Sequence, residues 1–268
     1  MANFHTSDLF HHFNRRIESA ELPAKFTYPF SYIPHKLCVE AVDLLKSHLE
    51  TQSEWRHDFG LKSENETNGI GKMFGVLVVE NAAGEIGYLA AFSGGLADGA
   101  NYPGFVPPVY DSEVYNAFVD DGMREITLIN EAILERETAS VDGSALGKID
   151  LLKHLRKTHS VSLLNKIFDQ YHFLNSAGKS KSLREIFRHI EPKSPPGGAG
   201  ECAAPKLLQY AFLNGMKPIA IAEFWWGKNP KKVNVEHGAF YPSCLDKCKP
   251  ILGHMLEGIE MDEPLDLS

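Results

Sequence analysis

The sequence lacks any long hydrophobic run. Nowhere in its 268 residues do about 18 apolar residues follow one another, which is the length that a membrane-spanning helix requires. The first residues contain no apolar stretch of the kind found in secretory signal peptides, and there are only four cysteines. We therefore expect a protein without membrane contact that resides in the cytoplasm, where thiols stay reduced and disulfides are rare.

Internal repeats are missing as well, and so is the composition of a disordered chain. Hydrophobic residues make up 43% of the sequence, aromatic residues 10% and charged residues 23%, which is enough apolar material for one sizeable core or two small ones. The net charge of -8 argues against a protein that coats nucleic acid without specificity. A globular protein with a defined site is the class that remains.

The charge is distributed unevenly along the chain. Residues 148–193 carry ten Lys or Arg against four Asp or Glu, whereas residues 111–142 carry nine acids against two arginines. Two solvated helical faces would explain this pattern, and so would a basic patch that meets RNA phosphates. In the second interpretation, Trp225 and Trp226 would stack on bases, unless they pack in the core. The basic candidates for RNA contact are Lys179, Lys181, Arg184 and Arg188.

Apolar spacing predicts an α/β fold with helices before and after a hairpin and a buried strand. In the hairpin, two β-prone runs flank the turn sequence NAAGE, where Gly84 can take a positive φ. A short apolar run before Gly227 is typical of a buried strand. The predicted ranges are a helix at 36–52, a hairpin at 72–94, several helices within 112–190, a helix from about residue 202, a strand at 215–227 and a closing helix at 244–258.

Three of the four cysteines lie at the predicted starts of two helices. Pro205 lacks an N–H, so its helix begins within about one turn before it, which places Cys202 at or beside the N-terminus. Cys244 and Cys248 are four residues apart after Pro242 and share one helical face. The positive end of a helix favours thiolate, and thiolates select zinc in a cytoplasm. The sequence therefore predicts a zinc site at these three cysteines.

Other interpretations stay open at this point. Free cysteine is also a small core residue, and three of them can lie near helix starts without a metal. The fourth cysteine, Cys38, shares a face with apolar residues of the first helix, which favours a core position over a role as fourth ligand. His237 is a candidate fourth ligand or acid-base group, although a single loop histidine is usually neither. Lys206 would help to hold thiolates or a phosphate, unless it is an exposed helix lysine.

The segments CAAPKLL (202–208) and PSCLDKC (242–248) resemble the zinc motif of the cytidine deaminase fold. In that family a His or Cys, then Ala, then Glu opens one helix and P-C-x-x-C opens the next, and the Glu shuttles a proton while zinc activates water. The resemblance implies a three-layer α/β fold with zinc ligands at Cys202, Cys244 and Cys248. The sequence departs from the family at Ala204, which stands in place of the catalytic Glu, and in the spacing of the second segment.

An active deaminase would therefore need another carboxylate. Glu201 lies three residues before Ala204, which is the same face on a continuous helix, but Pro205 favours a position of Glu201 at or before the cap. One functional interpretation is therefore deamination of a nucleobase or nucleoside, with Glu201 as proton shuttle. It is the alternative to the interpretation that follows.

That second interpretation rests on long strings that occur in order along the chain: FTYPFSYIPHKLC, GFVPPVYD, FDQYHFLNSAGKSKSLREIF, PPGGAGECAAPKLLQYAFLNGMKPIAIAEFWWG and HGAFYPSCLDKCKPILGHMLEGI. They resemble the region that precedes the catalytic domain in large bacterial RluA-type RNA pseudouridine synthases. The family's catalytic H-R-L-D segment does not occur in this sequence. The resemblance implies a zinc-binding, deaminase-like accessory module that helps to bind or position ribosomal or transfer RNA for a pseudouridine synthase catalytic domain, in cis or in trans.

The predicted organisation has three parts. Residues 1–25 form an N-terminal extension, and residues 26–259 form the deaminase-like domain. A helical insertion at 112–194 interrupts this domain and ends in the Pro- and Gly-rich stretch PKSPPGGAG. Residues 260–268 form an acidic tail or the start of a linker to a catalytic domain.

Overall fold

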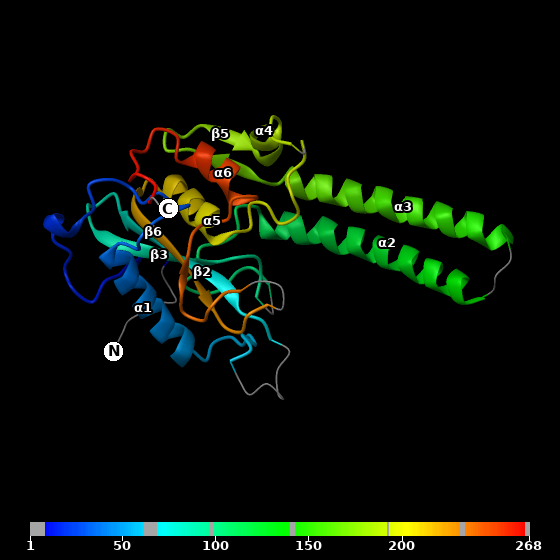
Figure 1. Ribbon diagram of the computed structural model, residues 1–268, viewed down its shortest axis with the longest axis horizontal. Coiled ribbons are helices and arrows are strands. Elements are labelled where there is room, and N and C mark those ends of the chain that lie inside the picture. The colour runs from blue at the N-terminus through cyan, green and yellow to red at the C-terminus, as the bar shows by residue number, and fades with distance from the viewer. Residues whose placement is uncertain are drawn as a thin grey trace. The chain divides into compact units, whose positions relative to one another are not determined.

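The computed structural model of the protein describes residues 9–61, 69–96, 99–139, 143–191, 193–230 and 234–265. The chain divides into two compact units, one formed by Met1–Val109 with Phe173–Ser268 and the other by Tyr110–His172. It contains helices and antiparallel sheets, so the predicted α/β class is confirmed. Figure 1 shows the elements and labels all but the short β1, η1, β4 and β7. In chain order they are β1 (His11–His12), the 3-10 helix η1 (Ser19–Glu21), α1 (Lys36–Thr51), β2 (Lys72–Glu80), β3 (Ile86–Phe92), α2 (Ser112–Ala139), α3 (Gly143–Phe168), β4 (His172–Leu174), β5 (Ser180–Ser182), α4 (Leu183–Phe187), α5 (Ala203–Leu213), β6 (Lys217–Trp226), β7 (Phe240–Tyr241) and α6 (Cys248–Met255).

The first unit is built on an antiparallel sheet with the strand order β1-β3-β2-β6-β7. β2 and β3 form the predicted hairpin, in which Gly84 takes a φ of 77°, a conformation that is free of steric cost for glycine. β6 pairs with β2 over its full length, from Trp226 opposite Lys72 to Lys217 opposite Glu80. The hairpin and the apolar strand, which are far apart in the sequence, therefore form the centre of one sheet.

Helices cover both faces of this sheet. Successive residues of a strand point to opposite faces, so Phe74, Val76 and Val78 of β2 share one face, where they are buried in a cluster with apolar residues of α1. α5 lies on the other face, where it contacts β2, β3 and β6, and α6 packs against α5 (Figure 1). The unit thus has three layers, with α1 below the sheet and α5 and α6 above it in the view of Figure 1.

Small residues let α5 approach the sheet closely. Gly75 of β2 lies opposite Glu223 of β6 in the sheet register. A Cβ atom at Gly75 would lie 3.0 Å from the Cβ atom of Ala203 and 3.2 Å from a methyl group of Leu207, both in α5. Ala203 and Ala204 are themselves fully buried. The first turn of α5 is therefore held against the middle of the sheet.

A two-stranded sheet and a short helix complete the first unit. β4 pairs with β5, and the Asn175 side chain closes the turn between them by accepting the backbone N–H groups of Ala177 and Lys179. Ser182 caps α4 by accepting the N–H of Glu185, whose carboxylate accepts the N–H of Ser182 in return. α4 packs against α6, which connects this corner to the layer of α5 and α6.

The second unit is a hairpin of the two long helices α2 and α3, which lie side by side (Figure 1). Lys153 of α3 pairs with Glu137 of α2 at 2.8 Å, and His159 Nδ1 lies 3.0 Å from the Glu125 carboxylate. The acidic stretch and the first part of the basic stretch therefore face each other across this hairpin. Within the described part of the chain, no helix has both the length and the apolar character to cross a membrane.

Both ends of the closing helix and the end of the helical insertion differ from those predicted from the sequence, and α6 ends at Met255 rather than at residue 258. α6 begins at Cys248 and not at residue 244, because Pro250 has no N–H to donate back along the chain, so residues 245–247 form a turn. The compact helical unit ends at His172, whereas the predicted insertion extended to residue 194. The difference arises because β5 and α4 belong to the first unit, where α4 packs on α6.

The close packing of α5 on β2 predicts that Gly75→Val lowers the free energy of unfolding by about 1–3 kcal/mol, because the added methyl groups overlap Ala203 and Leu207. Urea unfolding followed by circular dichroism measures this loss. Gly253→Val in α6 is the matched control, since a Cβ atom at Gly253 meets no atom within 4 Å. We expect the control to change stability by at most about 0.5 kcal/mol, and equal losses in the two variants would contradict the packing described above.

Candidate metal centre

Three cysteines from two distant segments converge beside the starts of α5 and α6. Cys202 is the N-cap residue of α5, as the position of Pro205 predicted. Cys248 is the first residue of α6, and Cys244 lies one turn before it. The Sγ atoms of these three cysteines all lie within 4.8 Å of one another. The structure thus brings together the cysteines that the sequence predicted as ligands.

The spacing of the thiols is close to the spacing of sulfur ligands around a small tetrahedral metal ion, although one pair is closer together. The Sγ atoms of Cys202 and Cys244 are 3.9 Å apart, and those of Cys244 and Cys248 are 3.2 Å apart. Zinc–sulfur bonds of about 2.3 Å at tetrahedral angles place two sulfur atoms about 3.8 Å apart. Among the residues that the structure describes, no fourth Cys, His, Asp or Glu side chain joins the group. The group therefore offers three sulfur ligands, and Cys244 is exposed to solvent.

Hydrogen bonds within the group shift the pKa values of its thiols. The bonds that Cys244 shares with Cys202 and Cys248 lower the pKa of Cys244, and the backbone N–H groups of Lys247 and Cys248 act in the same direction. The hydrogen bond with Cys244 raises the pKa of Cys202, the bond with Cys248 opposes this, and burial raises it further. The pKa of Cys248 is raised by its hydrogen bonds with Cys202 and Cys244 and by burial. The three thiols are therefore connected by hydrogen bonds, and a bound cation would require them as thiolates.

A buried carboxylic acid, Glu223 of β6, lies on the α5 side of the sheet, with only 4% of its surface exposed. The Ser243 hydroxyl and the backbone N–H of Ala204 both donate to its carboxyl group. Burial raises the pKa of Glu223 to about 7 and the nearby Cys244 adds to this, while the two hydrogen bonds oppose it. Glu223 was not predicted from the sequence. A signal for it was present, since it is the one acid in the apolar strand KPIAIAEFWW and a buried acid requires hydrogen-bond partners.

Lys206 is buried, contrary to the interpretation as an exposed helix lysine. Its ammonium group donates to the carbonyl oxygens of Phe92 at 3.0 Å and Gly94 at 2.9 Å. Burial lowers the pKa of Lys206 to about 8, whereas the charges of Glu201 and Cys202 raise it. Glu201 itself precedes the cap of α5 and is not part of the thiol group. Its carboxylate therefore compensates the charge of Lys206 and does not join the three thiols.

His237 and Trp226 lie on the other face of the sheet. The rings of the two residues have centroids 4.3 Å apart, and His237 Nδ1 accepts the backbone N–H of Gly227. Trp226 and Cys38 belong to the core cluster beside α1. Neither His237 nor Cys38 therefore joins the thiols as a fourth ligand, and the buried Trp226 offers no ring face to a base. Trp225 is half-buried, and its indole N–H donates to the Gly227 carbonyl.

The basic residues predicted to contact RNA are exposed at one corner of the first unit. Lys181 and Arg188 line a groove of about 590 Å³ between α4 and α6. Glu185 and Glu257 line the same groove, so part of its positive charge is balanced locally. The four predicted residues, which are exposed on β5, on α4 or at their ends, are Lys179, Lys181, Arg184 and Arg188.

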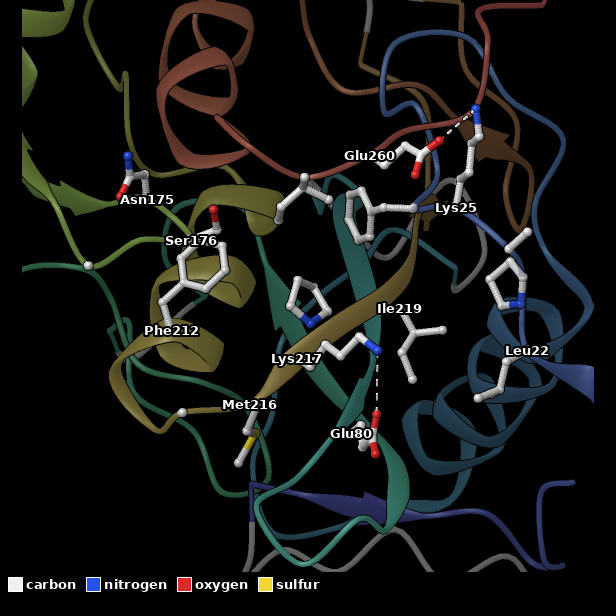
Figure 2. Close-up of a pocket in the computed structure, with 17 residues that line it drawn as sticks. Leu22, Lys25, Glu80, Asn175, Ser176, Phe212, Met216, Lys217, Ile219 and Glu260 are labelled. Carbon is white, nitrogen blue, oxygen red and sulfur yellow. Dashed lines mark ion pairs between the residues drawn. The ribbon is translucent and has the colours of Figure 1, made fainter. Parts of the chain in front are cut away.

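A second cavity of about 590 Å³ lies beside β6 and the segment after α6 (Figure 2). Its wall is largely apolar, and its lysines are paired, Lys25 with Glu260 at 3.0 Å and Lys217 with Glu80 at 3.8 Å. Of the described residues that line it, none is a cysteine or a histidine, and none was predicted as a ligand, catalytic or RNA-contacting residue. This cavity therefore offers apolar surface and two ion pairs.

Comparison of the chain with protein-family models, with curated proteins and with solved structures found no match. The resemblances to the cytidine deaminase fold and to RluA-type pseudouridine synthases therefore stay predictions from the sequence. The α/β fold and the thiol group follow from the structure itself.

The burial of Lys206 predicts a pH dependence of stability. The pKa of Lys206 is about 8 in the folded protein and 10.5 without burial, so the unfolded chain binds more protons than the folded protein between these pH values. The free energy of unfolding therefore rises with pH through this window, and this gain is lost as the pH falls through 8. We expect metal-free wild type to gain up to about 3 kcal/mol relative to Lys206→Met between pH 7 and 10.5. Urea unfolding at each pH measures the difference, and Lys249→Met, at an exposed position of α6, is the control. A wild-type advantage that does not change with pH would contradict the burial of this ammonium group.

Proposed function

We propose that the chain is a zinc-binding, deaminase-like accessory module for RNA modification. The observation that carries the proposal is the convergence of three thiols from the starts of two helices onto one point. Thiolates in a cytoplasm select zinc over harder cations such as magnesium and calcium. Cys202, Cys244 and Cys248 would hold the metal, which supplies a Lewis-acidic charge and a crosslink between α5 and α6 when it is bound.

The arrangement of elements supports the deaminase-like part of this proposal. A helix, a hairpin, a helix, a strand and a helix follow one another as α1, β2 with β3, α5, β6 and α6. α1 lies on one face of the sheet, and α5 with α6 lies on the other, where the cysteines stand at the helix starts. This is the placement that the resemblance implies for the zinc ligands.

The surroundings of the thiols favour an accessory role over deamination by Glu201. Position 204, where the deaminase motif has its Glu, is a fully buried alanine. Glu201 lies outside the thiol group and acts on Lys206. General acid-base work requires a carboxyl group within hydrogen-bond reach of the reacting atoms. The metal in this chain would therefore hold the fold together, and catalysis would come from an associated pseudouridine synthase domain.

The corner formed by β5 and α4 supports the RNA part of the proposal. Four exposed Lys and Arg side chains gather there within ten residues, on a rigid turn and a capped helix. Contacts to phosphates position an RNA without reading its sequence. A module of this kind would bind structured ribosomal or transfer RNA and orient it for a catalytic domain in the same or another chain.

For the metal, we expect protein purified without chelator to contain about one zinc per chain, because three thiolates supply most of a tetrahedral site. Cys244→Ser removes one of the three sulfur ligands and should abolish most of the bound zinc. Cys38→Ala removes a cysteine of the opposite layer and should leave the metal content intact. Elemental analysis by mass spectrometry measures all three proteins. Wild type with far less than one metal per chain, or Cys244→Ser with full content, would rule out this site.

For the RNA, titration of ribosomal RNA fragments at 50 and 200 mM salt tests the basic corner. If its four cations contact phosphates, reversing them all to Glu should reduce the slope of log affinity against log salt by about 3. Reversal of Lys25, Lys36, Lys217 and Lys228 gives a control with the same total charge at other positions. Salt-independent binding, or equal effects of the two sets, would leave the basic corner without a role in RNA binding. The basic corner consists of Lys179, Lys181, Arg184 and Arg188, and these are the four residues whose reversal is compared with the control set.

A further inference from the structure

Glu223 is the one acidic side chain that is buried among the residues that the structure describes. A carboxyl group is costly to bury unless hydrogen bonds replace its lost water. Its two donors, the Ala204 backbone and the Ser243 hydroxyl, both come from the segments that carry the cysteines. Ala204 follows Cys202 by two residues, and Ser243 directly precedes Cys244. The carboxyl group thus connects the two halves of the thiol group.

The first donor belongs to the unsatisfied start of α5. The first N–H groups of a helix have no partner inside the helix, and a side chain at the N-cap usually accepts one of them. Cys202 occupies the N-cap, but its side chain makes no capping hydrogen bond. The Glu223 carboxyl group, which reaches over from β6, accepts the N–H of Ala204 instead. The Cys202 Sγ is therefore left available to a metal.

The second donor fixes the chain that leads to Cys244. Ser243 is buried, and its hydroxyl group donates to Glu223. The backbone of Glu223 holds the same segment, since its N–H donates to the Tyr32 hydroxyl, which donates to the Tyr241 carbonyl at 2.9 Å. Glu223 also lies opposite Tyr241 in the pairing of β6 with β7. Both the side chain and the backbone of one strand residue therefore hold residues 241–243 in place.

We infer that Glu223 is a positioning residue of the metal site, whose carboxyl group caps α5 in place of Cys202 and holds Ser243, so that the Cys202 and Cys244 thiols are spaced before a metal binds. The inference rests on the proposed zinc site. Removing a group that holds a metal ligand in place weakens metal binding by about 10- to 100-fold. The ligand then has to be ordered when the metal binds, and this lowers the metal affinity.

The experiment compares zinc affinities of full-length variants by competition with a chromophoric chelator. Glu223→Met keeps the volume but removes the acceptor of both hydrogen bonds, so we expect zinc to bind about 10- to 100-fold more weakly. Glu223→Gln keeps an acceptor for Ala204 and can donate to Ser243, so it should recover most of the affinity. Ser243→Ala should cause a smaller loss of zinc affinity than Glu223→Met. In the double variant it should weaken zinc binding little further, because both substitutions break the same contact.

A control separates positioning from general stability. Leu45→Ala opens a cavity beside α1, on the opposite face of the sheet, and lowers stability without touching the thiols. We expect its zinc affinity to equal that of wild type. The absorption bands of the Co²⁺-substituted protein, which report the geometry of the sulfur ligands, should shift in Glu223→Met and stay unchanged in Leu45→Ala.

The outcomes distinguish this inference from the proposed function. Wild type that binds no zinc contradicts the zinc site and, with it, the role of Glu223. Wild type that binds zinc, with Glu223→Met and Ser243→Ala both within twofold of it, contradicts the inference alone. Equal losses in Glu223→Met, Glu223→Gln and Leu45→Ala would also overturn it, since the effect would then follow stability. If Glu223→Met does not fold, the zinc affinities of Ser243→Ala and Glu223→Gln test the inference in its place.

Discussion

The contact between the first turn of α5 and the β2–β6 pair is the constraint on which the candidate metal centre depends. Gly75 has no side chain to keep α5 away, and Ala203 fills the space in its place. The same contact aims the start of α5 at Glu223, which accepts the N–H of Ala204. Because a helix start is held at a fixed point above the sheet, its N-cap residue Cys202 meets the chain that precedes α6.

Buried charges around this contact compensate one another. The ammonium group of Lys206 donates to the carbonyl oxygens of Phe92, the last residue of β3, and of Gly94, and it lies near Glu201 and Cys202. Glu223 meets two donors, and its raised pKa of about 7 reflects its burial beside the thiols. Polar groups in a low-dielectric interior are stable only when each has a partner. The site is therefore a connected set of groups in which the loss of one member leaves another unsatisfied.

The charge asymmetry of the sequence has two structural explanations. Much of it lies in the helical hairpin, where acidic α2 and basic α3 face each other, with Lys153 of α3 paired to Glu137 of α2 and His159 beside Glu125. Four further basic residues lie on β5, on α4 or at their ends in the other unit, exposed to solvent. Exposed ion pairs between helices add little stability, and the second group is the one that the proposal for RNA binding involves.

The sequence by itself determined the local features: the hairpin with Gly84 in its turn, the buried strand before Gly227 and the position of Cys202 at a helix start. These follow from side-chain periodicity and from the missing N–H of proline, which act over a few residues. Only the tertiary structure decided that Glu223 and Lys206 are buried beside the thiols, and that His237 lies on the opposite face. The physical reason is that alternation along a strand defines two faces, but packing against helices distant in sequence decides what each face meets.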